Sequence, residues 1–513
     1  MILFVYALVL LLFPLQMHMM EAYAYAAAAE GYYNLSQTFA LLAQGKTLPD
    51  ISLYHPNHPL AHLVPGFLHR ALHWDVMTVF QVRNGISALV FTCFFYLTAA
   101  RLVSQRSAVI YATLLVIFTN AFWLAAISGE TQIPALALVM ATTYFLVRYF
   151  EINGGGRPVF LVAAACVYIA AGACHMATVM FSLPAGLSVL VYSRARSRWL
   201  LYLLVVLGII AGFAIFYGLL FIHFLKIDSV DMYLRTLFIY YPLLVKQYTS
   251  PEWWLATGKA FLVSVSASES VWGAASWLGA IGVIVLGYGA LWRAQANRAV
   301  KFLLVAWPLT QMIIQVIVNG RPDGTNFWLF LLPPFYLVAA FGFRQLRILL
   351  GGQLALPFIV AAVVLGNFLA FVLPNASLAR HEFVYLSEHA QYFENPPLAI
   401  IVTEPVLTYP ELWWAGSRYG LKQQKIFFPC CGEKDVGEHL DSWAAGQRKF
   451  LLVSDEVSGG FARAFVARKQ LRCNLLQETK GEIRSALIPV TVAVDYPPSG
   501  RVQKSLLLYY CTQ

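Results

Sequence analysis

Long apolar stretches, separated by short polar segments, occupy the first 374 residues of the chain. Most are about 17–25 residues long, the length that an α-helix needs to cross the hydrocarbon core of a bilayer. The pattern predicts a polytopic α-helical membrane protein with about eleven transmembrane helices. The predicted helices cover residues 2–17, 78–100, 108–127, 131–148, 158–174, 177–192, 199–224, 271–292, 301–318, 326–343 and 354–373.

The end of the chain follows a different pattern. Three short apolar runs are typical of buried strands, and two helical stretches lie between or near them. The runs are 398–403, 449–454 and 505–510, and the helical stretches are 433–445 and 460–470. We therefore predict a transmembrane domain over residues 1–374 and a soluble α/β domain over residues 375–513.

Composition agrees with this division. Hydrophobic residues make up 59% of the chain and charged residues only 12%, whereas soluble domains carry about a quarter charged residues. An ordinary cytosolic enzyme is therefore excluded. The net charge of +10 allows a nucleic-acid-binding protein, and the distribution of the charges decides against it.

Basic residues gather on one side of the predicted membrane. With the N-terminus in the cytoplasm, the inside loops hold twelve basic residues and one acid, Glu151. The outside loops before residue 375 hold eight basic residues and ten acids. This positive-inside pattern places the long loops 18–77 and 225–270 and the C-terminal domain outside. The positive charge is thus an orientation signal, and we expect no nucleic-acid partner.

The first apolar stretch has two interpretations. Residues 2–20 followed by Ala22-Tyr23-Ala24 could form a signal peptide with a cleavage site. No Lys or Arg precedes the stretch, and it is long for a signal peptide. A retained first helix is therefore favoured, and the rest of the topology is the same in both cases.

The outside loop 18–77 contains the largest set of candidate residues. Glu21 directly follows the first helix, where a partly desolvated carboxylate could act as a general base; a solvated interfacial acid is the alternative. Residues 27–45 have apolar side chains at helical spacing, which predicts an amphipathic helix in the membrane interface.

Three histidines follow in this loop, at positions 55, 58 and 62. Pro59 favours a helix that starts near His58, so His58 and His62 would share one face. Two histidines are weak evidence for a divalent cation such as zinc. Hydrogen bonding of His55 and His58 to a substrate or phosphate, and structural capping, are the other interpretations.

Four charged residues on the predicted outer face are further candidates. Glu130 opens the helix at 131–148, where the helix dipole favours an acid whether or not it is catalytic. Arg83 lies at the outer start of the helix at 78–100 and could bind a lipid phosphate or only extend toward water. Lys246 and Arg321 lie in other outside loops. Trp253 and Trp254 could belong to an interfacial aromatic belt or contact a lipid or sugar.

Four cysteines in the C-terminal domain are candidates for disulfides. A bond between the adjacent Cys430 and Cys431 would be strained. We therefore expect each of them to pair with one of Cys473 and Cys511, and four free thiols are the alternative.

Four motifs in this order resemble the GT-C superfamily of membrane glycosyltransferases. The bacterial branch related to protein O-mannosyltransferases and the lipid A aminoarabinose transferase is the most similar. The motifs are Met20-Glu-Ala-Tyr-Ala-Tyr25, Tyr54-His-Pro-Asn-His-Pro-Leu60, Ser128-Gly-Glu-Thr-Gln-Ile-Pro134 and Asn326-Phe-Trp-Leu-Phe-Leu-Leu-Pro-Pro334.

The resemblance implies transfer of a sugar from a polyprenyl-phosphate donor to a glycan, lipid or protein acceptor. The reaction would occur on the outer face of the bacterial inner membrane, with the C-terminal domain in the periplasm. The family commonly has an Asp-Glu pair after the first helix. Here Met20 precedes Glu21, so Glu130 is a second candidate for the base. A lipid or polysaccharide transporter and a non-catalytic scaffold subunit are the alternative functions.

Overall fold

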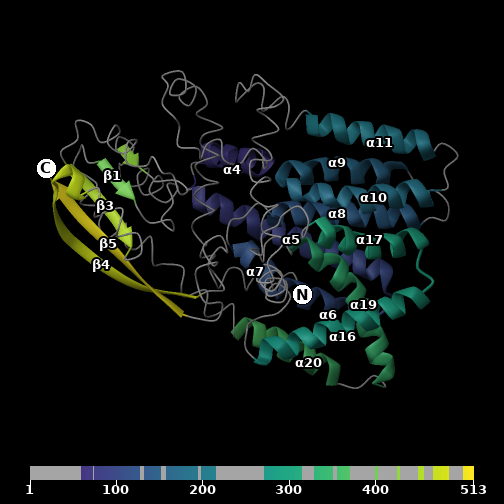
Figure 1. The fold of residues 1–513 in the computed structure, drawn as a ribbon. Helices are drawn as coiled ribbons and strands as arrows, with labels where there is room; N and C mark the ends of the chain where they lie inside the picture. Colours follow the sequence, from purple (N-terminus) through teal and green to yellow (C-terminus); the bar gives the residue numbers. More distant parts are fainter. Residues whose placement is uncertain are drawn as a thin grey trace. The chain divides into compact units, whose positions relative to one another are not determined.

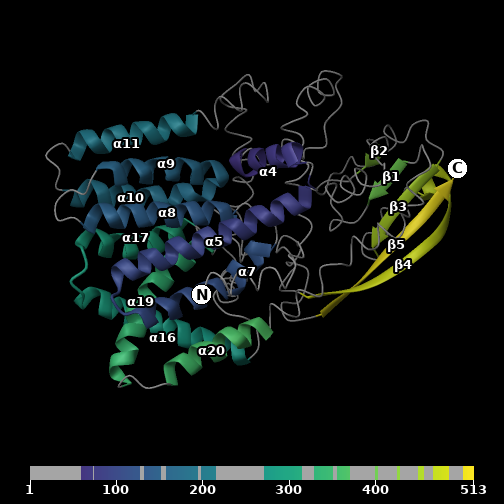
Figure 2. The same ribbon diagram turned by 180° about the vertical axis from the view of Figure 1, so that it is seen from behind.

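A computed structural model shows a helical unit and a sheet unit, each compact by itself (Figures 1 and 2). It describes residues 59–72, 74, 76–127, 132–151, 158–193, 198–214, 271–314, 329–350, 355–369, 399–402, 425–427, 449–455, 466–484 and 501–512. The helical unit holds the described residues from 59 to 369, and the sheet unit holds those from 399 to 512.

Every predicted transmembrane stretch within the described residues contains helix. The helices are α4 (Pro59–Leu72), α5 (Val76–Leu102), α6 (Arg106–Ile117), α7 (Asn120–Ile127), α8 (Gln132–Glu151), α9 (Pro158–Cys174), α10 (Val179–Tyr192), α11 (Arg198–Phe213), α16 (Val271–Arg293), α17 (Arg298–Ile314), α19 (Leu332–Leu349) and α20 (Ala355–Asn367). Short 3-10 turns, η1 (Met176–Thr178) and η4 (Leu329–Leu331), precede α10 and α19. The helix predicted to start near His58 is α4, with Pro59 as its first residue. The stretch 2–17 and the segment 27–45 lie outside the described residues.

The single helix predicted at 108–127 is wrong, because the structure has two helices there. Helix α6 ends at Ile117 and α7 begins at Asn120. Between them the Thr119 hydroxyl donates to the carbonyl of Val116 at 2.8 Å. A threonine side chain that binds a nearby carbonyl offers the backbone an alternative to the helical ladder. Because residues 108–127 are uniformly hydrophobic, their hydrophobicity alone does not predict the break between the two helices.

The helical unit has the surface of a membrane protein. Among the described residues, three helical segments are long and apolar enough to cross a bilayer, namely Val82–Leu102, Gln132–Glu151 and Leu329–Leu349, and several shorter apolar helices accompany them. Large apolar side chains such as Phe358, Val285 and Ile210 are more than half exposed. Water disfavours such faces and lipid accepts them. The unit is therefore a polytopic helical membrane protein, and the count of about eleven spans stays a prediction.

Close packing holds this unit together. Helix α8 packs against α5 and α9, α11 packs against α9, and α16 packs against α19. A Cβ atom added at Gly287 would overlap the carbonyl of Val338, and one at Gly342 would overlap the carbonyl of Val283. Lipid tails are as apolar as leucine, so helices in a bilayer associate through van der Waals packing, for which small residues allow close approach.

The sheet unit contains one five-stranded mixed sheet (Figure 1). Its strands are β1 (Ala399–Val402), β2 (Lys425–Phe427), β3 (Lys449–Asp455), β4 (Arg472–Arg484) and β5 (Arg501–Thr512), in the order β2-β1-β3-β5-β4. Strands β2, β1 and β3 are parallel, and β5 is antiparallel to both β3 and β4. The three predicted strands are confirmed as β1, β3 and β5. Residues 466–469 are helical, and the predicted helix at 433–445 lies outside the described residues.

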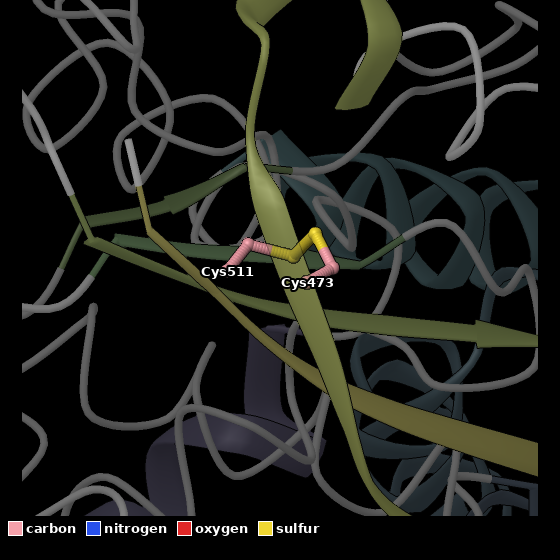
Figure 3. Close-up of a disulfide and its surroundings, with 2 residues drawn as sticks. All are labelled: Cys473 and Cys511. Atoms are coloured by element: carbon pink, nitrogen blue, oxygen red, sulfur yellow. A yellow bond between two sulfur atoms is a disulfide. The ribbon is translucent and has the colours of Figure 1, made fainter.

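A disulfide joins Cys473 of β4 to Cys511 of β5 (Figure 3). The two residues face each other in the antiparallel register, with their Cα atoms 4.0 Å apart. The predicted pairing of each with Cys430 or Cys431 is therefore wrong, because strand register makes Cys473 and Cys511 direct neighbours. Cys430 and Cys431 lie outside the described residues.

Candidate functional site

The structure describes one of the predicted site side chains of the transmembrane unit, that of Arg83. His62 belongs to α4, and its side chain is not described. The other predicted site residues of this unit lie outside the described residues; they are Glu21, His55, His58, Glu130, Lys246, Trp253, Trp254 and Arg321. Their roles stay predictions. Within the described ranges no group of three His, Cys, Asp or Glu residues could hold a metal ion, so the divalent cation stays a prediction as well.

Arg83 is half-buried in the second turn of α5, near the end that the charge pattern places outside. Its Nη1 atom donates to the carbonyl oxygen of Ala61 in α4 at 2.9 Å. Its Nε atom donates to Oδ1 of the adjacent Asn84, also at 2.9 Å. Two acceptors from different directions restrict the guanidinium to one orientation.

Asn84 is fully buried and extends this arrangement to a third helix. Its Nδ2 atom donates to the carbonyl oxygen of Ala125 in α7 at 3.1 Å. Ala125 belongs to the last turn of α7, where carbonyls lack a partner within the helix. The Arg83–Asn84 pair thus joins α4, α5 and α7 through polar contacts.

A second set of polar residues lies where α9 meets α10. The buried His175 follows α9, and its Nδ1 atom accepts a hydrogen bond from the backbone N–H of Ala177 at 3.0 Å. Its ring lies 6.0 Å from that of Phe330 in η4. Helix α4, whose Ala61 accepts from Arg83, packs against α9.

Two buried glutamines lie near helix ends of the same predicted side. The Nε2 atom of Gln311 in α17 contacts the sulfur of Met180 in α10 at 3.6 Å. The amide oxygen of Gln132, the first residue of α8, is buried without a hydrogen-bond partner among the described residues. Helices α8, α9 and α17 all have their predicted outer ends near these residues. We call Arg83, Asn84, Gln132, His175 and Gln311 the outer-end polar set.

The charge pattern identified Arg83, but our sequence reasoning missed the other four members of this set. The available signal was a polar residue inside or beside a long apolar stretch, which is costly in a membrane unless it is bonded or functional. His175, for example, stands between two apolar stretches that almost touch in the sequence.

Polar groups at the opposite helix ends have structural partners. The carboxylate of Glu151 lies 3.2 Å from Nε of Arg148 and 3.9 Å from Nη1 of Arg101. The Asn297 amide donates to the carbonyl of Phe150 at 2.6 Å, joining α8 to the segment that precedes α17. Such ion pairs and bonds between helix ends account for these residues without a ligand.

Comparison with known proteins gives the fold. No family of protein sequences matches the chain, and no curated protein matches it. Among solved structures, ArnT from Cupriavidus metallidurans bound to undecaprenyl phosphate matches with a TM-score of 0.59 and 12% identity, over 99% of this chain and 97% of that one. The same protein in the apo state matches with a TM-score of 0.56 and 12% identity, over 98% and 96% of the two chains. ArnT is the lipid A aminoarabinose transferase, of the GT-C family. The chain has the fold of that transferase over nearly its whole length, and the GT-C resemblance predicted from the sequence is thereby confirmed at the level of the fold.

Proposed function

We propose that the protein transfers a sugar from a polyprenyl-phosphate donor to a lipid, glycan or protein acceptor on the outer face of the bacterial inner membrane. The observation that carries the proposal is the similarity of fold, over nearly the whole chain, to an ArnT structure bound to undecaprenyl phosphate. The oriented guanidinium of Arg83, near the helix ends predicted to lie outside, supplies a group that suits a lipid phosphate.

The reaction needs a base and a set of cations. The acceptor oxygen attacks the anomeric carbon, its proton passes to a carboxylate, and the bond from the sugar to the lipid phosphate breaks with release of polyprenyl phosphate. Glu21 is our first candidate for the base and Glu130 the second. Attack opposite the leaving phosphate inverts the anomeric centre.

Cations and aromatic groups complete the proposed site. Arg83, Lys246 and Arg321 would stabilise the negative charge of the departing phosphate, and His55 and His58 would donate hydrogen bonds to it. Trp253 and Trp254 would contact the lipid chain or the sugar. The chain itself would place its N-terminus in the cytoplasm and the sheet unit in the periplasm.

The test uses the full-length protein in nanodiscs. Undecaprenyl-phosphate-linked sugars are supplied with an envelope lipid and glycan extract as acceptor, and released undecaprenyl phosphate is measured. We expect the wild type to release it and Glu21→Gln or Glu130→Gln to lose most of the release. Glu151→Gln is the matched control, because Glu151 is paired with Arg148 and Arg101 at the opposite helix ends.

Two results would contradict parts of this proposal. Full activity of both Glu21→Gln and Glu130→Gln would show that neither residue is the base. Movement of a fluorescent lipid-linked saccharide between leaflets, without release of undecaprenyl phosphate, would replace the transferase by a transporter. A wild type that does neither would favour a scaffold subunit.

A further inference from the structure

Helix α4 contains a proline in its interior, and that proline releases a carbonyl. Pro65 has no backbone N–H, so the carbonyl oxygen of Ala61, four residues earlier, lacks its helical hydrogen bond. Ala61 is only 2% exposed. A buried carbonyl without a partner is unfavourable, so another donor must reach it.

Arg83 is that donor. Its Nη1 atom lies 2.9 Å from the oxygen of Ala61. A carbonyl is an uncharged acceptor, so this contact orients the guanidinium and itself adds no counter-charge. Pro65 therefore creates an uncharged acceptor that helps to hold the guanidinium.

Asn84 holds the same guanidinium from a second direction. Its Oδ1 atom accepts from Nε of Arg83, and its Nδ2 atom donates to the carbonyl of Ala125. The side chain of Asn84 is completely buried, so the two hydrogen bonds of its amide group form without competition from water. The side chain that fixes Arg83 is thus tied to the end of α7, three residues before Glu130 in the sequence.

We infer that Pro65 and Asn84 are positioning residues for Arg83, which they hold in the orientation that binds the phosphate of the lipid donor. This inference rests on the proposed function. Neither residue needs to touch the substrate: Pro65 acts by releasing the Ala61 carbonyl, and Asn84 acts by accepting from Arg83 while it is bound to α7.

Substitution Pro65→Ala separates positioning from structure. Alanine restores the N–H that competes with Arg83 for the Ala61 carbonyl, and it favours the helix itself. The variant should therefore keep or raise the thermal midpoint while kcat/KM for the donor falls about tenfold. A purely structural role would instead lower the midpoint.

Pro308→Ala is the matched control, because it makes the same chemical change inside α17. There the released carbonyl is that of Leu304, which accepts from the hydroxyl of Tyr288 at 3.3 Å. No cation is involved, so kcat/KM for the donor should stay within about twofold of the wild-type value.

Asn84→Asp tests the second contact. It keeps the shape and the acceptor for Arg83 but removes the donor to Ala125 and adds a negative charge beside the guanidinium. We expect weaker donor binding, by about tenfold or more. Either substitution should have little further effect in an Arg83→Met background, because both act through Arg83.

The deciding measurement is the affinity of nanodisc-embedded protein for undecaprenyl phosphate, with undecaprenol as the phosphate-free probe. The inference is supported if the wild type prefers undecaprenyl phosphate and both Pro65→Ala and Asn84→Asp reduce that preference. If the wild type shows the preference and both variants retain it, the inference is overturned while the proposed function stands. If the wild type does not distinguish the two lipids, the proposed function and the inference both fail.

Discussion

Among the described helices, α4, α10 and α17 contain an interior proline. In α4 and α17 the carbonyl that the proline releases accepts from a side chain of another helix, and the two donors differ in kind. In α4, the carbonyl released by Pro65 accepts from the guanidinium of Arg83 at 2.9 Å. In α17, the carbonyl released by Pro308 accepts from the hydroxyl of Tyr288 at 3.3 Å. Both solutions meet the same demand, since lipid supplies no donor to an open backbone group.

The two donors, a tyrosine hydroxyl and an arginine guanidinium, differ in charge, and the charge is what we relate to function. A tyrosine hydroxyl satisfies the Leu304 carbonyl and adds apolar contact area, which is all that helix packing requires. An arginine satisfies the Ala61 carbonyl and in addition brings a positive charge close to the bilayer, where a charge is costly. Phosphate binding is the use that we propose for that charge.

Removing the charge at Arg83 should have the largest effect. Arg83→Met should reduce kcat/KM for release of undecaprenyl phosphate about 100-fold, as does loss of one group that stabilises transition-state charge in other enzymes. Arg298→Met, at the exposed start of α17, is the matched control and should stay within about twofold. Near-normal activity of Arg83→Met would show that the contact at Pro65 is as purely structural as the contact at Pro308.

The second largest effect should come from forcing α16 away from α19, which would disturb the hydrogen bond between Tyr288 of α16 and the Leu304 carbonyl. A Cβ atom at Gly287 would overlap the backbone of Val338 in α19, and Tyr288 is the following residue. Gly287→Ala should therefore destabilise the unit by about 1–3 kcal/mol, measured as the thermal midpoint in detergent. Gly289→Ala meets no atom within 4 Å and should be neutral or stabilising; equal midpoints for the two variants would contradict this packing.

Removing the neutral donor should have a smaller effect. Tyr288→Phe deletes the hydroxyl that donates to the Leu304 carbonyl. We expect a loss of about 1 kcal/mol in stability, because hydrogen bonds between membrane helices are modest. Transfer activity should not change, and a loss of activity as large as that of Arg83→Met would show that this site is functional too.

The smallest effect is expected for Tyr288→Phe once the backbone donor of α17 has been restored by Pro308→Ala. In a Pro308→Ala background, the N–H of residue 308 can bond the Leu304 carbonyl, so Tyr288→Phe should cost less than about 0.5 kcal/mol. The measurement is a double-mutant cycle on the thermal midpoint. An undiminished cost in that background would mean that Tyr288 stabilises the unit by packing rather than by this bond.

The helices could be predicted because the bilayer sets their length and excludes their charges. Range 158–174 coincides with α9, and the other described helices from α5 onward overlap predicted ranges. The break between α6 and α7, where the Thr119 hydroxyl donates to the Val116 carbonyl, was missed because a local contact of this kind does not change the average hydrophobicity.

The sheet could be predicted only for the strands that have a neighbour on both sides. Strands β1, β3 and β5 are apolar runs in the interior of the sheet, and edge strands β2 and β4 were missed. Strand β2 has only three residues, and the second half of β4 is largely polar, as a strand with one solvated face can be. The register that brings Cys473 opposite Cys511, 38 residues apart in the chain, is likewise invisible in the sequence.

The sequence by itself determined that the chain is a helical membrane protein and predicted which helix ends lie outside, because transfer into lipid depends on residue type and length alone. It also marked Arg83 as a basic residue near one of those ends. Only the tertiary structure decided what Arg83 touches. Its partners, Ala61 and the Asn84 that is bound to Ala125, come together through the packing of α4, α5 and α7. A carbonyl released by a proline becomes an acceptor for a cation only when another helix brings that cation to it.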